Sequence, residues 1–293
     1  MSRSAAAAHD FWVLIPAYNE EPTVREVAAR ARRYCAHVLV VDDGSTDGTC
    51  EALAGLDIIL LRNEQNRGKA DSLWQGFELA LAQGAAGVIT LDADGQHAPE
   101  EIPSFIAATL KDPDALVVGA RRSLQRKRSS WRYLANRIAD FWISWAAGRP
   151  IEDSQSGFRF YPAQLLRDLT LKHGRQQSFV FESEVMIETA RRGVRFVFIP
   201  IGVAPRVGAR TSHFRPVVDI VRITKMIVLK LLRRGLYLQG FYRAFIRRPD
   251  PIVRLQRMVV TPRTGMADLD SQESQPCPVS CRRRKCGLSS PLR

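Results

Sequence analysis

The sequence predicts an α/β fold in which a mostly parallel sheet is flanked by helices on both faces. Two observations lead to this fold class. Short, continuous apolar runs alternate with segments of helical periodicity, which is the pattern of strand-helix-strand units. Several of the apolar runs also end in polar clusters, and ligands bind beyond the carboxyl ends of the strands in open sheets of this kind.

The first apolar run, at residues 11–15, stops at Pro16 and predicts a buried strand. Residues 21–34 have helical spacing and predict a helix, with Pro22 near its first turn, where the missing N–H is harmless. The further predicted elements are, in chain order, strand 38–41, strand 58–61, helix 69–83, strand 87–91 and strand 116–120. This alternation is what predicts parallel strands.

The composition is that of a globular protein. Of the 293 residues, 45% are apolar and 25% are charged, so we expect a sizeable core. The odd number of cysteines, 5, without paired spacing in the folded part predicts no disulfide framework and fits a reducing, cytosolic compartment. Residues 1–10 lack the features of a signal peptide, and no apolar run approaches the ~18 residues that a membrane span needs.

Charge is divided unevenly along the chain. Residues 1–116 carry 9 basic and 18 acidic residues, a net charge of −9, whereas residues 117–293 carry 34 and 12, a net charge of +22. This imbalance predicts an anionic partner for the back half, either nucleic acid or the anionic face of a membrane. A merely solvated basic surface is the alternative.

Two segments of the back half have the composition of membrane-associating helices. Residues 131–145 hold three tryptophans, which suits the membrane interface and a buried helix equally. Residues 217–234 predict a basic amphipathic helix that lies on a bilayer surface, with an ordinary core helix as the alternative. Its predicted polar face holds Asp219, Arg222, Lys225, Lys230, Arg233 and Arg234, and its apolar face holds Ile220, Val221, Ile227, Val228 and Leu231.

The chain therefore divides into four predicted parts. A flexible N-terminus covers residues 1–10, and the α/β domain covers residues 11–215. Basic amphipathic, membrane-associating helices follow at residues 216–248. Residues 249–293, where apolar periodicity fades and Ser, Pro, Gln and Arg accumulate, are predicted to be a disordered tail.

Asp92 and Asp94 follow the apolar run at residues 87–91, and alternate residues of an extended chain share a face. Two carboxylates placed together repel unless a cation lies between them. Mg²⁺ and Mn²⁺ prefer such oxygen ligands, and Gln96 adds a neutral amide oxygen. We therefore predict that these three residues hold Mg²⁺ or Mn²⁺ on a diphosphate, although a lone Asp-x-Asp also occurs in exposed turns.

Asp42 and Asp43 follow another predicted strand and face the same edge. As ionised carboxylates they accept hydrogen bonds, for example from a nucleobase N–H or from ribose hydroxyls. Helix capping through Ser45 or Asp47 is the alternative, and both interpretations are compatible. Lys69 opens a helix, where a cation and free N–H groups suit a phosphate; a solvated lysine of the first turn is the alternative.

The order and spacing of these clusters resemble the successive motifs of family 2 glycosyltransferases, in particular the dolichol- and polyprenyl-phosphate mannosyltransferase branch. The resemblance covers roughly residues 11–215. The motifs that carry it are PAYNE at residues 16–20, VDDGSTDGT at 41–49, NRGK at 66–69 and DADGQH at 92–97.

This resemblance implies a GT-A fold, inverting chemistry and a nucleoside-diphosphate sugar as donor. The residues implied to hold the nucleoside are Pro16, Ala17, Tyr18, Glu20 and Asp43. The residues implied to hold the metal are Asp92, Asp94 and Gln96. The predicted donor site consists of the five nucleoside residues together with Asp42, Lys69 and Asp92.

On the acceptor side, residues 153–159 are similar to a family motif, so the resemblance implies acceptor contacts from Ser156 and Arg159. Arg121 matches a family basic residue near the acceptor phosphate. Arg206 matches an arginine of the mobile loop that closes on the diphosphate. A further stretch, around Glu182 and Glu184, resembles a family acidic motif.

We predict Asp153, Arg121 and Arg206 as catalytic residues. A lipid-phosphate acceptor brings an oxygen that is already anionic, so Asp153 would position it; a hydroxyl acceptor would need Asp153 as general base. A turn residue or a partner of Arg159 is the alternative for Asp153.

The function predicted from these features is sugar transfer to a membrane lipid acceptor of the polyprenyl-phosphate kind. The predicted enzyme is peripheral on the cytoplasmic face of the membrane, binds an anionic membrane surface and binds no nucleic acid. Transfer to a hydroxyl of a glycan or glycolipid is one alternative, and a non-catalytic membrane-binding nucleotide-sugar adaptor is another. A nucleotidyltransferase or a dinucleotide dehydrogenase would need a glycine-rich loop after the first strand, which residues 16–20 do not provide.

Overall fold

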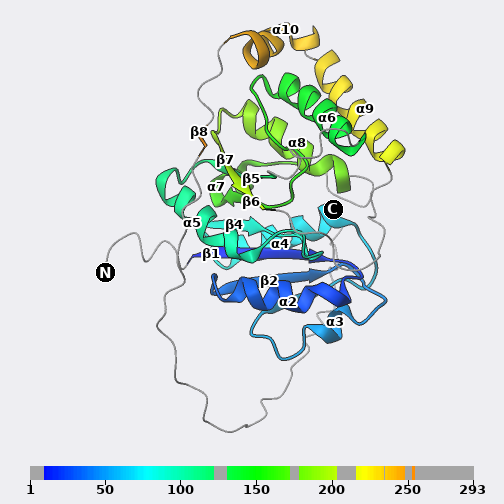
Figure 1. The fold of residues 1–293 in the computed structure, drawn as a ribbon, viewed down its shortest axis with the longest axis vertical. Helices are drawn as coiled ribbons and strands as arrows, with labels where there is room; N and C mark the ends of the chain where they lie inside the picture. The colour runs from blue at the N-terminus through cyan, green and yellow to red at the C-terminus, as the bar shows by residue number, and fades with distance from the viewer. Residues whose placement is uncertain are drawn as a thin grey trace, which may run out of the picture. The chain divides into compact units, whose positions relative to one another are not determined.

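The computed structural model describes residues 10–121, 131–171, 178–202, 216–233, 235–247 and 253–254. These residues form one 8-stranded sheet with the strand order β3-β2-β1-β4-β6-β5-β7-β8 (Figure 1). The described pairs are parallel except those of β6, which runs antiparallel to both β4 and β5. The predicted α/β class with a mostly parallel sheet is confirmed.

The strands are β1 (Phe11–Ala17), β2 (His37–Asp42), β3 (Ile59–Arg62), β4 (Gly87–Thr90), β5 (Leu116–Arg121), β6 (Arg159–Pro162), β7 (Phe196–Ile201) and β8 (Val253–Arg254). The longer helices are α2 (Glu21–Arg32), α4 (Lys69–Ala82), α5 (Ile102–Lys111), α6 (Trp131–Ala147), α8 (Ser178–Arg191) and α9 (Pro216–Leu232). The short helical segments are α3 (Thr49–Ala52), η1 (Pro99–Glu101), α7 (Ala163–Asp168), η4 (Gly235–Tyr237), α10 (Leu238–Phe241) and η5 (Tyr242–Ile246). The predicted elements are present, with ends shifted by no more than two residues.

Strand β1 shows how the sheet is covered on both faces. Successive side chains of a strand point to opposite faces. Trp12 and Leu14 pack in one apolar cluster with side chains of α4 and α8, whereas Val13 and Ile15 pack in a second cluster with side chains of α2 and α5. All four are buried, which is why the strand reads as a continuous apolar run.

Strand β1 continues through Pro16, where the sequence predicted an end. The Leu14 carbonyl accepts a hydrogen bond from Leu91 beside β4, and the Ala17 carbonyl accepts one from Asp43 beside β2. By this alternation the nitrogen of Pro16 faces the β4 side, beyond the last registered pair, Leu14 with Thr90. The missing N–H therefore removes no ladder bond.

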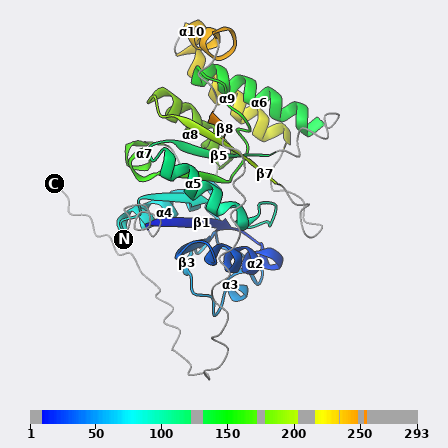
Figure 2. The ribbon, with the colours of Figure 1, turned by 60° about the vertical axis from the view of Figure 1, so that its left-hand side comes forward.

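The C-terminal helices pack over the face that also carries α4 and α8 (Figures 1 and 2). Ile227 and Leu231 of α9 are buried in the same cluster as side chains of α6 and α8. A second contact, which we call the aromatic cluster, joins α6 to α10 and η5. Its members are Phe141, Trp142, Trp145, Phe241 and Phe245, and the ring centroids of Phe141 and Phe245 lie 4.9 Å apart.

The amphipathic pattern predicted for residues 217–234 is only partly right. Ile227 and Leu231 face the core as predicted, but Lys230 does so as well, with a side chain only 18% exposed. Its Nζ lies 2.9 Å from Glu184 Oε1 and 2.8 Å from Glu188 Oε1, both on α8. Lys230 is three residues from Ile227 and therefore shares its face. Val228, predicted to be on the apolar face, is exposed.

The division of the chain at residues 215 and 216 stays a prediction, because residues 203–215 lie outside the described part. The same holds for the N-terminal residues 1–9, for the side chains of residues 216–223 and for nearly all of the predicted tail at 249–293. Within the part of the chain that the structure describes, no helix is both long and apolar enough to cross a membrane.

Candidate functional site

The turns that follow β1, β2 and β4 meet at the carboxyl edge of the sheet. Ser45 Oγ accepts a hydrogen bond from the Asn19 N–H at 2.9 Å, and Asn19 Oδ1 accepts one from the Thr46 N–H at 2.8 Å. Thr23 Oγ1, in α2, donates to the Ala93 carbonyl at 2.7 Å. The structure thus brings the three predicted polar clusters together.

The predicted nucleoside contacts lie along this edge. Pro16 and Ala17 end β1, while Tyr18 and Glu20 lie in the partly exposed turn before α2. The Glu20 N–H donates to Thr49 Oγ1 at 2.8 Å, which ties this turn to the one after β2. Contact of these residues with a nucleoside stays a prediction.

Asp43 holds the loop that precedes α4. Its carboxylate accepts hydrogen bonds from Asn63 Nδ2 at 2.9 Å, from the Arg67 N–H at 2.9 Å and from the Gly68 N–H at 2.7 Å. Gly44 allows this close approach, because it has a φ of 70° and a Cβ there would lie 2.5 Å from the Gln65 carbonyl carbon. Asp43 therefore fixes the backbone of the loop at the site through hydrogen bonds.

Asp42 differs from its neighbour. Its Oδ1 accepts a hydrogen bond from the Ser45 N–H at 3.0 Å, whereas its buried Oδ2 accepts none from the described residues and lies 3.3 Å from Arg62 Nε. An ionised carboxylate oxygen normally accepts more than one bond. Of the two predicted carboxylates, Asp42 is the one with accepting capacity left for a ligand.

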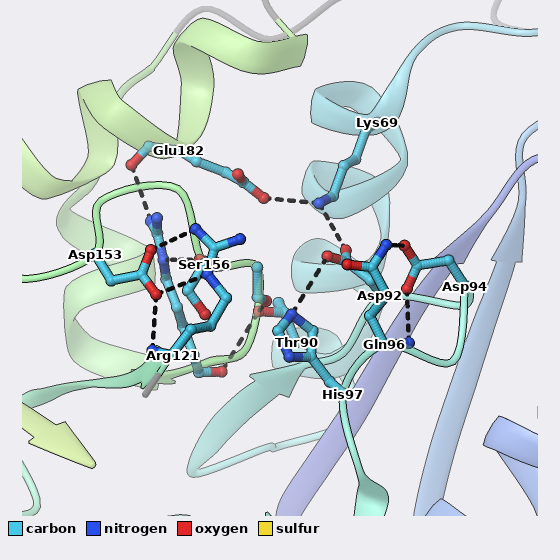
Figure 3. Close-up of polar contacts among 12 residues, drawn as sticks. Lys69, Thr90, Asp92, Asp94, Gln96, His97, Arg121, Asp153, Ser156 and Glu182 are labelled. Carbon is cyan, nitrogen blue, oxygen red and sulfur yellow. Dashed lines mark hydrogen bonds and ion pairs between the residues drawn. The ribbon is translucent and has the colours of Figure 1, made fainter. Parts of the chain in front are cut away.

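Lys69 is held between two carboxylates from different elements (Figure 3). Its Nζ lies 2.6 Å from Asp92 Oδ1 and 2.8 Å from Glu182 Oε1. Burial disfavours the charged amine, but the two carboxylates outweigh burial and hold the pKa of Lys69 above its ordinary value. Burial also opposes ionisation of Asp92, yet Lys69 outweighs it and lowers the pKa of Asp92. Lys69 is therefore a charged member of the site, not a solvated residue.

Asp94 and Gln96 form a turn beside Asp92. Asp94 Oδ1 accepts a hydrogen bond from the Gln96 N–H at 3.1 Å, and Asp94 Oδ2 accepts one from Gln96 Nε2 at 2.7 Å. Because the chain turns at residues 93–95, the expected extended alternation of the two aspartates is wrong. The Gln96 side chain donates through its nitrogen, which leaves its amide oxygen available as a ligand.

The donor set fits the predicted Mg²⁺ or Mn²⁺ in kind, since Asp92, Asp94 and Gln96 offer oxygen atoms only. Gly157 provides the room for this set, because a Cβ there would lie 2.5 Å from Asp92 Oδ2. In the described part of the chain, no group of three or more His, Cys, Asp or Glu side chains is arranged to hold a metal. A metal here would depend on two carboxylates, one amide and oxygen atoms of the ligand, and it stays a prediction.

His97 lies behind Asp92, with its Nε2 3.9 Å from Asp92 Oδ2. Burial lowers the pKa of His97, so the imidazole is neutral at pH 7. Its ring centroid lies 5.7 Å from that of Phe158. The sequence placed His97 in a motif without assigning it a role, and the structure places it behind Asp92, beyond hydrogen-bond distance.

Arg121 and Asp153 form the second half of the site. Asp153 Oδ2 accepts hydrogen bonds from the Arg121 N–H at 2.8 Å and from Nε at 2.7 Å, and Oδ1 accepts one from Nη2 at 2.5 Å. Burial opposes the guanidinium charge, but Asp153 outweighs it and raises the pKa of Arg121. The alternative pairing of Asp153 with Arg159 is wrong, because the Arg159 guanidinium donates to backbone carbonyls instead.

Arg159 is fully buried and binds backbone carbonyls. Its Nε donates to Ser156 at 2.8 Å, its Nη1 to Glu182 at 2.9 Å and its Nη2 to Ser154 at 2.7 Å. These bonds fix the loop between α6 and β6. The Ser156 hydroxyl is buried and has no hydrogen-bond partner among the described residues. Acceptor contacts of Arg159 and Ser156 stay predictions, and Arg206 lies outside the described residues.

Sequence reasoning did not single out two residues of the site. Asp140 of α6 accepts hydrogen bonds from Ser154, and Gly157 packs against Asp92. A signal for Asp140 existed, because it is the one acidic residue in the α6 sequence, among aromatic and apolar neighbours. A signal for Gly157 did not, since its need for a small side chain arises from a strand distant in sequence.

Known proteins resemble this chain in sequence and in fold. A family model described as Glycosyl transferase family 2 matches residues 12–175. The polyprenol monophosphomannose synthase of Mycolicibacterium smegmatis is 29% identical over 200 residues, which cover 64% of this chain and 75% of that protein. The undecaprenyl-phosphate mannosyltransferase of Micrococcus luteus is 31% identical over 203 residues, covering 64% and 81%.

A solved structure of glucosyl-3-phosphoglycerate synthase from Mycobacterium tuberculosis, in complex with Mn²⁺, UDP and glucosyl-3-phosphoglycerate, has the same fold. The TM-score is 0.56 at 23% sequence identity, and the match covers 79% of this chain and 81% of that chain. A further structure of that enzyme, in complex with Mg²⁺ and UDP, gives a TM-score of 0.57 at 21% identity, covering 80% and 84%. At this level of identity the likeness concerns the fold alone.

Proposed function

Because the chain belongs to glycosyl transferase family 2, we propose that it transfers a sugar from a nucleoside-diphosphate sugar to a lipid phosphate of the polyprenyl kind. The names of its relatives support the acceptor class, since polyprenol and undecaprenyl phosphate appear in them. The UDP and Mn²⁺ or Mg²⁺ held by the structurally similar enzyme support the donor class. Inversion at the sugar carbon is part of the proposal and follows from the family resemblance.

One observation carries this proposal. At one edge of the sheet, an acidic set around Asp92 faces a basic residue, Arg121, that is held rigidly by Asp153 (Figure 3). Thr90 is drawn between the two sets in this view. An acidic set suits a metal-bound diphosphate, and a fixed guanidinium suits a phosphate, since its planar fork matches phosphate oxygens. The diphosphate of the donor and the phosphate of the acceptor would then be bound on adjacent sides of the site.

The state of Asp153 supports a phosphate over a hydroxyl acceptor. A general base needs a carboxylate oxygen within reach of the proton it removes. Both oxygens of Asp153 accept N–H groups of Arg121, so Asp153 is engaged in orienting the guanidinium. A phosphate oxygen is already anionic and needs no base. We propose that Arg121 holds the acceptor phosphate and that Asp153 fixes Arg121.

Asp92, Asp94 and Gln96 would hold Mg²⁺ or Mn²⁺, which when bound supplies positive charge to the departing diphosphate. The protein contributes its own positive charge through Lys69, whose ammonium Glu182 keeps next to Asp92. Asp42 would accept a hydrogen bond from the nucleoside through its Oδ2, which accepts none from the described residues and lies 3.3 Å from Arg62 Nε. Electrostatic stabilisation of this kind is usually the largest catalytic contribution.

We also propose peripheral association with the cytoplasmic face of a membrane, through a C-terminal apolar surface. Its exposed side chains are Ile138, Phe141, Val228, Leu229, Leu232, Leu236, Leu238, Tyr242, Phe245 and Ile246. Exposed cations occur in the same helices or directly after them, at Arg137, Lys225, Arg233, Arg243 and Arg247. Apolar side chains mixed with cations favour an anionic bilayer. This surface differs from the face predicted from periodicity, because Ile227, Leu231 and Lys230 face the core.

The proposed transfer is tested with the purified full chain, a panel of nucleoside-diphosphate sugars and polyprenyl phosphate in detergent. We expect a glycosyl-phospholipid product that forms only when a divalent cation is present. Asp92→Asn should lower turnover at least about 100-fold, whereas Asp114→Asn, at an exposed position, should not. Transfer to hydroxyl acceptors alone would overturn the lipid-phosphate acceptor. Nucleotide-sugar binding without any turnover would favour the adaptor.

A further inference from the structure

Helix α6 is attached along one face to the loop that leads to β6. Asp140 Oδ1 accepts hydrogen bonds from the Ser154 N–H at 2.9 Å and from Ser154 Oγ at 2.6 Å. One turn later, Ser144 Oγ accepts a hydrogen bond from the Ile151 N–H at 3.0 Å. Residues four apart share a face of a helix. Asp140 and Ser144 therefore form one contact line between α6 and this loop.

The point at which Asp140 binds is adjacent to the acceptor side of the site. Ser154 is fully buried and directly follows Asp153, whose two oxygens hold Arg121. Asp153 has a φ of 50°, in the left-handed region that a non-glycine residue adopts only when its surroundings impose it. The bonds on Ser154 are part of that surrounding. On its other side, the Ser154 carbonyl accepts from Arg159.

From these contacts we infer that Asp140 is a positioning residue. It sets the orientation of the Arg121 side chain through Ser154 and Asp153. Arg159 fixes the carbonyl side of Ser154, and Asp140 fixes its N–H and hydroxyl. With both sides held, the Asp153 carboxylate points at Arg121 in one orientation. The inference rests on the proposed function only for the nature of the acceptor.

The charges around Asp140 are consistent with this role. Burial raises the pKa of Asp140 to about 6, Asp153 adds to this increase, and the Ser154 bonds and Arg121 oppose it. Ionising this carboxylate costs free energy, which its two hydrogen bonds from Ser154 offset in part. The two Ser154 bonds use a single oxygen, Oδ1, so an asparagine can make both.

Kinetics with three variants test the inference. Asp140→Ala removes both bonds and should lower kcat/KM for the acceptor about 10- to 100-fold, the range expected for hydrogen bonds to a charged group, while KM for the donor stays unchanged. Asp140→Asn should restore acceptor kinetics. Ser144→Ala, the matched control on the same helix, removes a buried bond to the same loop and should leave acceptor kinetics unchanged. Equal effects of Asp140→Ala and Ser144→Ala on acceptor kinetics would overturn the inference.

Hydrogen exchange provides a measurement that does not depend on the acceptor. In Asp140→Ala the amides of residues 151–157 should exchange faster than in the wild type and in Asp140→Asn, with residues 11–90 unchanged. Unchanged exchange at residues 151–157 would overturn the positioning role, whatever the activity. Wild-type protein that transfers no sugar to polyprenyl phosphate would instead overturn the proposed function and leave the exchange result to decide the role of Asp140. If Asp140→Ala does not fold, Asp140→Asn with acceptor kinetics below one tenth of wild type overturns the inference.

Discussion

The carboxylate of Asp92 lies against a residue that has no side chain. A Cβ on Gly157 would lie 2.5 Å from Asp92 Oδ2 and 2.8 Å from Oδ1, so an alanine there must displace the carboxylate. Asp92 in turn positions Lys69, which it contacts at 2.6 Å. A single methyl group at Gly157 would thus disturb two charges of the site.

We expect Gly157→Ala to lower turnover about 10- to 100-fold, as small displacements of catalytic groups do. Binding of Mn²⁺ and nucleotide, measured by calorimetry, should weaken in parallel. Gly202→Ala is the matched control, because a Cβ at Gly202 meets no atom of the described residues within 4 Å and its backbone is not left-handed. Equal activity of the two variants would show that Asp92 is not held where the structure has it.

Asp140 gives the stability of the protein a dependence on pH. Burial raises the pKa of its carboxyl from 3.8 to about 6 in the folded protein. Between these values the folded state binds the proton more tightly than the unfolded chain does. The contribution of Asp140 to the free energy of unfolding therefore decreases as the pH rises from about 4 to about 6.

Asp140→Asn removes this titration. We expect the Tm of the variant, relative to wild type, to increase between about pH 4 and pH 6 and to level off above that range. Thermal unfolding followed by circular dichroism at several pH values measures this difference. A difference in Tm that is constant across the range would contradict the raised pKa.

Several residues of the site were predictable from the sequence because they follow apolar strands. Asp42 and Asp92 were placed at the binding edge in this way, and their partners now explain how they are held. Asp43 and Arg159 were also noticed, but their tertiary bonds give them loop-shaping contacts that no motif reveals. Whether a polar residue faces a ligand or its own loop depends on contacts between distant segments.

At the scale of elements, α9 is attached to α8 by charge as well as by apolar packing. Lys230 bridges Glu184 and Glu188, and these side chains are only 16–18% exposed. Burial opposes ionisation of Glu188, but Lys230 outweighs it and lowers the pKa of Glu188. This contact holds the helix that carries part of the C-terminal apolar surface.

We expect Lys230→Met to lower the free energy of unfolding by about 1.5–3 kcal/mol, because Glu184 and Glu188 both lose the Lys230 cation. Glu188 keeps its contacts with Arg191 and Arg192. Lys225→Met, at an exposed position of the same helix, should change it by less than about 0.5 kcal/mol. Urea unfolding at pH 7 compares the two. A loss of stability for Lys225→Met as large as that for Lys230→Met would mean that the ion pairs contribute little.

The elements also differ in how far the sequence could predict them. Strands β1, β2, β4 and β5 were found because burial on both faces produces continuous apolar runs. Strand β6 was missed, because its four residues begin with Arg159 and end with Pro162. Its place depends on antiparallel pairing with β4, where Gly87 leaves room for the ring of Phe160. Such a partner is a tertiary property.

At the scale of the molecule, the back half combines a net charge of +22 at residues 117–293 with an exposed apolar surface. Leu232, Leu238 and Ile246 are 56%, 69% and 62% exposed. Separate exposed apolar residues are ordinary, but ten on helices that pack together indicate a contact with an apolar partner. The proposed lipid acceptor lies in a bilayer, so the enzyme would have to contact the bilayer surface to reach it.

We expect the full chain to sediment with vesicles that contain anionic lipid, and binding to weaken as salt is raised. Replacing Leu232, Leu238 and Ile246 together by serine should reduce binding at least about tenfold, given roughly 1.5–3 kcal/mol for each large apolar side chain buried. Ile59→Ser with Leu60→Ser, at the exposed edge strand β3, is the control and should leave binding unchanged. An equal loss of vesicle binding in both variants would contradict the C-terminal surface as the membrane contact.

The aromatic cluster has a mechanical consequence. Phe141 of α6 stacks on Phe245 of η5 with ring centroids 4.9 Å apart, and Trp145 packs edge-on against Phe241 at 5.2 Å. These ring contacts join α10 and η5 to α6, so a force on the last helical turns would be transmitted to α6. With the membrane contact proposed above, the lateral pressure of the lipids would act on α6, the helix that Asp140 joins to the loop carrying Asp153.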